Sequence, residues 1–308
     1  MILAWLPGIG VVEPVSERTA YDVNAFRARF TEVRFCGYDT RIHPYIFQFT
    51  LAARLKDCDI VKADFTGSLP GVLAKRLYGT RLVVNYNYHA LRIAEIHGKP
   101  AHVLWLRILR RLALRAADGV IVASRALEQE VLAAGYRGYR VVVPNGVDLE
   151  RFRPSEQRWT APVILTVGRD SPEKNLSVVR EAVAQIKGAV LNEVRGLPYA
   201  QMPTAYQSAS VFVLPSLTEG CSKSLLEAMA SGLRCIATMA AAEGLAGGWD
   251  PLIIMENDSD PSQWASAIRH ALKDPELGAS SRAWVERHHD IRRTLFQEVA
   301  FLKWVGRR

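Results

Sequence analysis

Cysteine is scarce in this chain, and the cysteines that it has lie far apart. The 308 residues include four, with no C-x-x-C pair and no spacing typical of a metal site. This pattern predicts reduced thiols in a cytosolic protein, each acting as a small buried apolar side chain. The four are Cys36, Cys58, Cys221 and Cys235.

Long apolar segments are also absent. No run of about 18 apolar residues occurs, so we expect no transmembrane helix. The first segment, MILAWLPGIGVV, has no basic residues before its apolar part and is interrupted by Pro7 and Gly8, which predicts a buried strand and loop instead of a signal peptide. A G-x-G-x-x-G fingerprint is missing as well, which argues against an NAD-dependent dehydrogenase. The sequence therefore predicts a cytoplasmic protein.

The first half of the chain has fewer acidic than basic residues, whereas the second half is balanced. The net charge is +8, and residues 1–154 hold 22 Lys and Arg against 14 Asp and Glu, whereas residues 155–308 hold 17 of each kind. The whole positive excess lies in the first half. This asymmetry predicts an anionic partner for that half, such as a lipid phosphate or a membrane surface.

What the sequence does contain is a repeated alternation of buried strands with helical segments. A chain of this length with 49% apolar residues can fill two ordinary cores, so we expect two domains. Strand, helix and strand at this spacing predict α/β domains with a parallel, doubly wound sheet, in which ligands bind at the carboxyl ends of strands. The predicted strands of the first half are residues 2–6, 33–36, 60–63, 82–84, 120–123 and 141–143.

The most informative stretch is VFVLPSLTEGCSKSLLEAMASG, from Val211 to Gly232. Its apolar start predicts a buried strand, followed by a polar turn and a helix. Glu219 lies in the turn, and Glu227 lies eight residues later in the helix. The residues between them offer small side chains and backbone N–H groups at a helix N-terminus, where an anion is favoured. These residues are Gly220, Cys221, Ser222, Lys223 and Ser224.

This order of carboxylate, anion site and carboxylate fits a nucleoside diphosphate sugar. Glu219 can accept hydrogen bonds from sugar hydroxyls, Glu227 can take the two hydroxyls of a ribose, and the N–H groups between them face the diphosphate. Two Glu residues at this spacing also fit a helix cap and a solvated helical side chain. The surrounding residues favour the first interpretation.

Three segments resemble one enzyme family. PSLTEGCSKSLLEAMASG resembles the E-x7-E signature of retaining glycosyltransferases of family 4, which have the GT-B fold. VVVPNGVDLERFRP, residues 141–154, is similar to the family's P-N-G-V-D-x-x-x-F-x-P string, found where the first domain hands over to the second. GRDSPEKN, residues 168–175, is similar to its G-R-x-x-x-x-K-N segment.

The resemblance implies two Rossmann-like, doubly wound parallel-sheet domains with an interdomain cleft. We expect an acceptor-side domain at residues 1–150 and a nucleotide-sugar-binding domain at residues 151–289. The helix at about residues 290–308 is expected to pack back on the first domain. Compared with the family, the second domain is expected to be shortened by about one β-α unit.

For activity, the resemblance implies transfer of a hexosyl group from a UDP- or GDP-linked sugar to the hydroxyl of a glycan, glycolipid or small molecule. It also implies that configuration is retained, and we expect that no metal, other cofactor or nucleic acid takes part. Arg169 and Lys174 would stabilise the departing diphosphate, and Glu219 would hold the donor sugar. The expected donor-binding residues are Asn145, Gly168, Gly220, Cys221, Ser222, Lys223, Ser224 and Glu227.

Three residues of the first half are expected near the donor or the acceptor. Gly10 belongs to the PGIG loop, which resembles the family's Gly-rich loop after the first strand and fits a plain turn equally well. Tyr86 begins a stretch where many relatives carry a His, and His89 lies just beyond it. His89 fits a solvated loop residue as well as a ligand contact.

AHVLWLRILRRLALRAA, residues 101–117, predicts an amphipathic helix whose apolar side, including Ile108 and Leu112, packs on the sheet. Its basic side either lies in water or meets anionic lipid at the inner face of a membrane, with Leu104 and Trp105 near the interface. The basic side consists of Arg107, Arg110, Arg111 and Arg115.

The remaining expectations concern the second domain and the function. Residues 173–187 predict one helix and residues 239–248 a flexible loop, and His288 and His289 are expected at the surface because no partner spacing surrounds them. Two alternatives to a glycosyltransferase stay open. One is a non-catalytic GT-B module that binds a sugar nucleotide or a glycolipid, and the other is a nucleotide-sugar epimerase.

Overall fold

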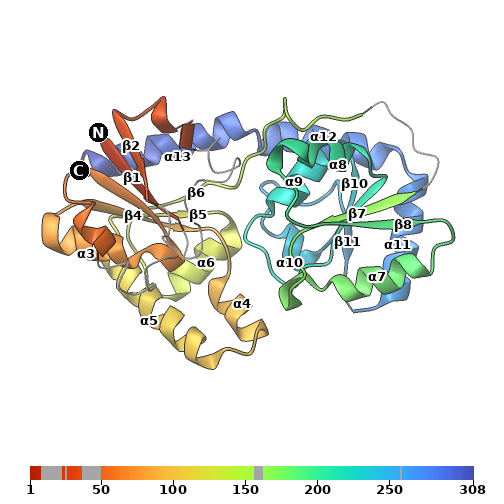
Figure 1. Cartoon of the computed structure of the whole chain (residues 1–308), viewed down its shortest axis with the longest axis horizontal. Coiled ribbons are helices and arrows are strands. Elements are labelled where there is room, and N and C mark those ends of the chain that lie inside the picture. Colours follow the sequence, from red (N-terminus) through yellow and green to blue (C-terminus); the bar gives the residue numbers. More distant parts are fainter. Residues whose placement is uncertain (8–22, 25, 37–49, 156–161, 257–258) are drawn as a thin grey trace. The chain divides into compact units, whose positions relative to one another are not determined.

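The computed structural model describes residues 1–7, 23–24, 26–36, 50–155, 162–256 and 259–308. The chain divides into two compact units, each built around a parallel sheet (Figure 1). Unit 1 comprises the described residues of Met1–Val143 together with Leu295–Arg308, and unit 2 comprises those of Pro144–Thr294. The predicted α/β architecture with two parallel sheets is confirmed.

Unit 1 has a six-stranded sheet in the order β2-β1-β3-β4-β5-β6, and every pair of neighbouring strands is parallel. Short apolar runs form these strands because each is buried on both faces of the sheet. The predicted strands agree with the observed ones to within two residues at each end. The bounds are β1 Ile2–Leu6, β2 Glu32–Phe35, β3 Ile60–Asp64, β4 Arg81–Tyr86, β5 Gly119–Val122 and β6 Arg140–Val142.

Helices cover both faces of this sheet. On one face α13 packs through Val299, Leu302 and Val305 into a core with strand residues such as Leu3 and Ile60. On the other face lie α3 and α5 (Figure 1). The α13 helix begins among the residues of unit 2 and ends among those of unit 1. The bounds are η1 Phe65–Gly67, α3 Leu69–Tyr78, α4 Ala90–Ile96, α5 Pro100–Ala116, α6 Arg125–Ala133 and α13 Ile291–Gly306.

A buried lysine fixes α13 to the sheet. Nζ of Lys62, on β3, lies 2.6 Å from Oε1 of Glu298 on α13 and 3.9 Å from the centre of the Trp5 ring. The lysine side chain is almost fully buried, and the glutamate is mostly so. An ammonium group at such a position is stable only when a carboxylate and an aromatic face compensate for its lost hydration.

Unit 2 has a five-stranded parallel sheet in the order β11-β10-β9-β7-β8. On one face α7 and α11 bury Val179, Trp264 and Ile268 against strand residues such as Ile164 and Val213. The strand bounds are β7 Val163–Val167, β8 Val190–Val194, β9 Val211–Leu214, β10 Arg234–Thr238 and β11 Ile253–Met255. The helix bounds are η2 Pro172–Lys174, α7 Leu176–Ala184, η3 Tyr199–Gln201, α8 Met202–Gln207, α9 Lys223–Ala230, α10 Met239–Ala242, α11 Pro261–Lys273 and α12 Glu276–His288.

Two local predictions for unit 2 are wrong. The single helix over residues 173–187 is a 3-10 turn followed by a shorter α-helix, because Asn175 adopts a left-handed backbone (φ 49°) that an α-helix cannot continue through. The flexible loop over residues 239–248 starts with a helical turn, α10. The hydroxyl of Thr238 caps this turn by accepting a hydrogen bond from the N–H of Ala241.

Replacing Lys62 by Met is expected to destabilise the protein by about 3–5 kcal/mol, because it leaves the mostly buried Glu298 carboxylate without its cation. The double variant Lys62→Met/Glu298→Gln should lose less, since it removes both charges. Urea denaturation followed by tryptophan fluorescence measures both. A single variant that is as stable as the double one would contradict this account of α13.

Candidate active site

Two loops of unit 2 meet at a topological switch point. Strands β7 and β9 are neighbours, yet the chain continues from β7 to β8 on one side of the sheet and from β9 to β10 on the other. At such a point the loops after the two strands diverge and leave room for a ligand at the carboxyl ends. The loops concerned are residues 168–175 and residues 215–222, and both hold residues of the predicted site.

An ion pair between two predicted site residues joins these loops. Nζ of Lys174 is in hydrogen-bond contact with Oε1 of Glu219, and the two side chains are 19% and 15% exposed. A backbone hydrogen bond of 2.8 Å from the N–H of Leu217 to the carbonyl of Glu173 links the same loops. The structure therefore brings Lys174 and Glu219 together in a partly buried position.

Arg169 does not join this pair. Its side chain is 86% exposed, and its ion pair is a loose one with the buried Glu173, at 3.8 Å. Gly168 precedes it, with an N–H that donates to the carbonyl of Val194 at 3.1 Å. A Cβ at Gly168 would lie 3.6 Å from Cε of Lys174, so the end of β7 packs beside the lysine stem.

The N-terminus of α9 follows Glu219 closely. Ser222 is its N-cap, and the Oγ of this serine accepts a hydrogen bond from the N–H of Leu225 and lies 3.1 Å from Oγ of Ser224. Lys223 is the first helical residue. None of the residues of the first turn, all described by the structure, is acidic, so no carboxylate there competes with a bound anion.

Glu227 lies one turn further along α9 and is only 3% exposed. The hydroxyl of Tyr206, on α8, donates a hydrogen bond to Oε2 of Glu227 at 2.9 Å. Tyr206 itself is fully buried among Phe152 and Phe212. The sequence does not predict this bond, because the two residues are 21 positions apart on different elements.

Two other segments of unit 2 contact the loop between Glu219 and Glu227. Nδ2 of Asn145 donates to the carbonyl of Cys221 at 2.6 Å. Gly244 packs so closely that a Cβ there would lie 2.2 Å from the carbonyl oxygen of Gly220. The Cys221 side chain is buried, and this burial raises the pKa of its thiol to about 12.

His289 is fully buried, which contradicts its expected place at the surface. Its Nδ1 donates to the carbonyl of Asn145 at 2.8 Å, and its Nε2 accepts a hydrogen bond from the N–H of Ala246 at 3.0 Å. His288, by contrast, is partly exposed and packs on the ring of Trp284. Sequence spacing missed His289 because both its partners are backbone groups, which any residue type provides.

In unit 1, the carboxylate of Glu130 on α6 accepts hydrogen bonds from three of the residues singled out from the sequence. The hydroxyl of Tyr86 and Nδ1 of His89 donate to Glu130, at 2.8 and 2.9 Å, and Arg110 donates at 3.0 Å. Burial alone would raise the pKa of the Glu130 carboxyl, but the bonds from His89 and Tyr86 and the charge of Arg110 outweigh it and hold the pKa below its ordinary value.

This cluster changes the expected roles of its members. Tyr86 is fully buried and supports Glu130, so its hydroxyl is not presented to a ligand. His89 precedes α4 at the carboxyl end of β4 and is oriented by Glu130, which leaves it a candidate for a donor or acceptor contact. Gly10, the third residue expected here, lies outside the described residues.

The exposed side of α5 differs from the predicted one. Arg110 is turned inward to Glu130, whereas Leu104, Ile108 and Leu112 are 61%, 46% and 42% exposed. These three residues, at four-residue spacing, form a single stripe on the helix. The prediction that Ile108 and Leu112 pack on the sheet is wrong, because Val103, Leu106, Leu109 and Ala113 already fill that contact.

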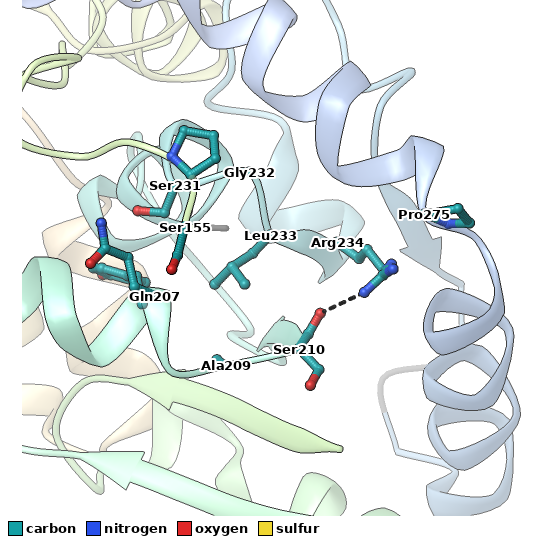
Figure 2. A pocket seen from close by; sticks show the side chains of 11 residues that line it. Ser155, Gln207, Ala209, Ser210, Ser231, Gly232, Leu233, Arg234 and Pro275 are labelled. Carbon is teal, nitrogen blue, oxygen red and sulfur yellow. Dashed lines mark hydrogen bonds between the residues drawn. The ribbon is translucent and has the colours of Figure 1, made fainter. Parts of the chain in front are cut away.

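Unit 2 also holds a cavity of about 490 Å³, which Tyr206 lines but the loops at residues 168–175 and 215–222 do not (Figure 2). It is found at the amino ends of β9 and β10, where Arg234 donates hydrogen bonds to the carbonyls of Ser210 and Asp274. Ligands of parallel sheets bind at the carboxyl ends, so this cavity does not mark the candidate site. Within the described part of the chain, no three His, Cys, Asp or Glu side chains gather closely enough to hold a metal ion.

Comparison with known proteins gives two family matches, one for each part of the chain. Residues 11–151 match the model described as Glycosyltransferase Family 4, and residues 161–274 match the model described as Glycosyl transferases group 1. The PNGVD segment lies near the end of the first match, and the GRDSPEKN and E-x7-E segments lie within the second.

Two curated relatives and one solved structure show the extent of similarity. The sulfoquinovosyl transferase SQD2 of Arabidopsis thaliana is 27% identical over 77% of this chain and 54% of its own. A GDP-mannose-dependent alpha-mannosyltransferase of Mycobacterium tuberculosis is 30% identical over 62% of this chain and 58% of its own. The chain thus spans about half the length of these relatives. Anabaena HepE in complex with UDP-glucose has a TM-score of 0.76 at 16% identity, over 97% of this chain and 98% of its own, which shows a shared fold.

Acid is expected to destabilise the protein through His289. Burial, together with the nearby His288, lowers the pKa of His289 from 6.5 to about 4, although the bond to Asn145 opposes this shift. Below pH 6.5 the unfolded chain binds a proton that the folded one does not, so stability present above that pH is lost as the pH falls towards about 4. The loss should be of the order of 3 kcal/mol.

Urea denaturation between pH 7 and pH 4 measures this effect. His289→Asn, which cannot titrate in this range, should lose stability less steeply than the wild type. His270→Gln, at an exposed histidine of α11, is the matched control and should follow the wild type. Parallel curves for the wild type and His289→Asn would show that His289 is not the group responsible.

Proposed function

Because this chain belongs to the glycosyltransferases of group 1 and family 4, we propose that it moves a hexosyl group from a nucleoside diphosphate sugar, UDP- or GDP-linked, to an acceptor hydroxyl with retention of configuration. The observation that carries the proposal is the contact of Lys174 with Glu219 beside the N-terminus of α9. A cation, a carboxylate and a helix N-terminus at one switch point are the groups that a sugar diphosphate needs.

The Lys174–Glu219 ion pair opens when the donor binds. The diphosphate brings negative charge to Nζ of Lys174 and competes with Glu219 for it. Glu219 then accepts hydrogen bonds from the sugar hydroxyls. Neither charge is left without a partner during this exchange, which avoids the cost of an isolated charge in a partly buried site. Arg169, exposed at the rim of the same loop, adds a second cation.

Catalysis in this proposal is electrostatic. As the bond from C1 of the sugar to the phosphate oxygen breaks, Lys174 and the first N–H groups of α9 stabilise the charge on the diphosphate. The acceptor oxygen bonds to C1 on the same face, and a phosphate oxygen takes its proton. This course retains configuration without a protein nucleophile. The thiol of Cys221 does not suit that role, because burial keeps it protonated.

Glu227 binds the ribose. Its carboxylate can accept both ribose hydroxyls, and Tyr206 holds one of its oxygens from the protein side. Because Tyr206 is a neutral donor, it does not compete with the ribose as a second cation would. Two similar proteins support a sugar-nucleotide donor. The mannosyltransferase of Mycobacterium tuberculosis is named as GDP-mannose-dependent, and the structure of Anabaena HepE is that of a complex with UDP-glucose.

Two substitutions separate the proposed roles. Glu227→Ala should weaken nucleotide binding by about ten- to a hundredfold, because it removes the acceptor of the ribose hydroxyls. Lys174→Ala should mainly lower kcat, because its charge counts most as the leaving group departs. Thermal shifts with UDP, GDP and ADP and their sugars, followed by initial rates with the donor that binds, measure both effects.

Glu181→Ala is the matched control, since Glu181 is an exposed glutamate on α7. It should leave binding and turnover unchanged. If none of these nucleotides raises the melting temperature, the result would instead favour the non-catalytic module. Conversion of the free sugar nucleotide without an acceptor would indicate an epimerase.

We also propose that unit 1 binds an anionic membrane surface through α5. The exposed stripe of Leu104, Ile108 and Leu112 lies on the same helix as three exposed arginines, the first of which pairs loosely with Glu95, at 3.5 Å. Apolar side chains flanked by arginines suit the boundary between lipid headgroups and acyl chains. None of the described helices is long and apolar enough to cross a membrane. The three arginines are Arg107, Arg111 and Arg115.

Flotation with vesicles tests this surface. The wild type should float with vesicles that contain anionic lipid, and less so in high salt. Replacing Leu104, Ile108 and Leu112 by Ser should weaken binding roughly tenfold or more through lost apolar contact. Phe296→Ser is the control, because Phe296 is more exposed than any residue of the stripe but lies on α13. Absence of wild-type flotation, or equal loss in the control, would argue against α5 as the membrane surface.

A further inference from the structure

Two segments of unit 2 hold the loop that precedes α9. From one side, Asn145 donates through Nδ2 to the carbonyl of Cys221 at 2.6 Å. From another, the backbone of Gly244 packs on Gly220, with only 2.2 Å between a Cβ placed there and the Gly220 carbonyl oxygen. Neither segment is a neighbour of the loop in sequence. Long-range contacts therefore help to hold this loop.

His289 connects these two segments. Its Nδ1 donates to the carbonyl of Asn145, and its Nε2 accepts from the N–H of Ala246, two residues after Gly244. A carbonyl can only accept and an N–H can only donate, so these partners place the proton on Nδ1 and leave the ring neutral. The imidazole of His289 thus links the two segments that contact the loop.

The backbone around His289 is fixed as well. Its carbonyl accepts from the N–H of Val147 at 2.8 Å, and the N–H of Ile291 donates to the carbonyl of Val147 at 3.1 Å. Val147 and Asp290 pair as a parallel bridge. The segment of His289 therefore lies beside the segment of Asn145, and the ring cannot shift without breaking these bonds.

Peptide geometry carries the effect into the loop. In a planar trans peptide the C=O of one residue and the N–H of the next point in opposite directions. Since Asn145 holds the carbonyl of Cys221, it also fixes the direction of the N–H of Ser222. Ser222 is the N-cap of α9, where the diphosphate is proposed to bind. An N–H aimed in advance binds and stabilises an anion without first having to reorganise.

We propose that His289 is a positioning residue of the donor site, because its neutral imidazole joins the two segments that set the orientation of the Gly220–Ser222 loop. The inference rests on the proposed function, since it concerns how that site is held. His289 itself touches no substrate in this account. It acts through Asn145 and Ala246, one link on each ring nitrogen.

Graded substitution tests both links. His289→Phe keeps a planar ring but removes both hydrogen bonds. Nucleotide Kd should therefore rise about tenfold, and kcat/KM should fall at least as much. His289→Asn keeps a donor for the carbonyl of Asn145, and His289→Gln keeps an acceptor for the N–H of Ala246. These two variants should lie between the wild type and His289→Phe. Calorimetric titration with UDP and GDP, together with initial rates, gives the order.

A purely structural role would lower stability without acting on the loop. Ile268→Val, on the buried side of α11, is the stability control and should leave nucleotide Kd unchanged. Hydrogen exchange of the amides from Glu219 to Leu225 gives a readout that needs no ligand. Exchange there should accelerate severalfold in His289→Phe and not in Ile268→Val.

The outcomes separate this inference from the proposed function. Faster loop exchange in His289→Phe alone supports the positioning role even if the wild type binds no nucleotide, a result that would overturn the proposed function only. Unchanged loop exchange in a folded His289→Phe overturns the inference, and so does an equal change in Ile268→Val. Tight nucleotide binding by His289→Phe at the wild-type Kd would overturn it as well.

Discussion

The ion pair between Lys174 and Glu219 is the contact on which the proposed donor site depends. The sheet brings the loops after β7 and β9 to one edge, but strand pairing does not fix the side chains that they carry. The ion pair does so. Pairs near a surface contribute only about 0–1 kcal/mol to stability, so this one matters for arrangement more than for folding. It keeps an ammonium group and a carboxylate side by side in a partly buried place, ready to exchange partners with an anionic ligand.

The two carboxylates of the E-x7-E stretch lie in different surroundings, which suits them to the different tasks proposed for them. Glu219 faces a cation that a phosphate can take from it, so its hydrogen-bonding capacity becomes available only with a charged ligand. Glu227 is more deeply buried and accepts a hydrogen bond from the neutral hydroxyl of Tyr206, which a ribose hydroxyl does not have to displace. A ligand that brings a phosphate beside Glu219 and hydroxyls to both Glu219 and Glu227 therefore fits the two carboxylates better than a ligand with hydroxyls alone.

Local sequence predicted the strands and the motif loops, because both depend on short runs: apolar residues buried on two faces, or small residues before a helix. It failed where distant segments meet. His289 is bonded to a carbonyl 144 residues away, and nothing in its neighbourhood signals that partner. Asn175 breaks a regular helical pattern with one left-handed residue. Helical periodicity likewise gave the apolar residues of α5 but not how many of them the sheet could cover, which left Ile108 exposed.

The charge of unit 1 shows how far a residue count can be used to infer a partner. The positive excess of the first half includes cations that the fold employs internally. Lys62 is buried against Glu298, Arg110 is bonded to Glu130, and Asp118 pairs with both Lys75 and Arg81. Such charges are compensated within the protein and add little to the field that an anionic surface meets. The arginines that matter for a partner are those left at the surface beside an apolar stripe. For that reason the exposed side of α5, and not the net charge, carries the argument for a membrane.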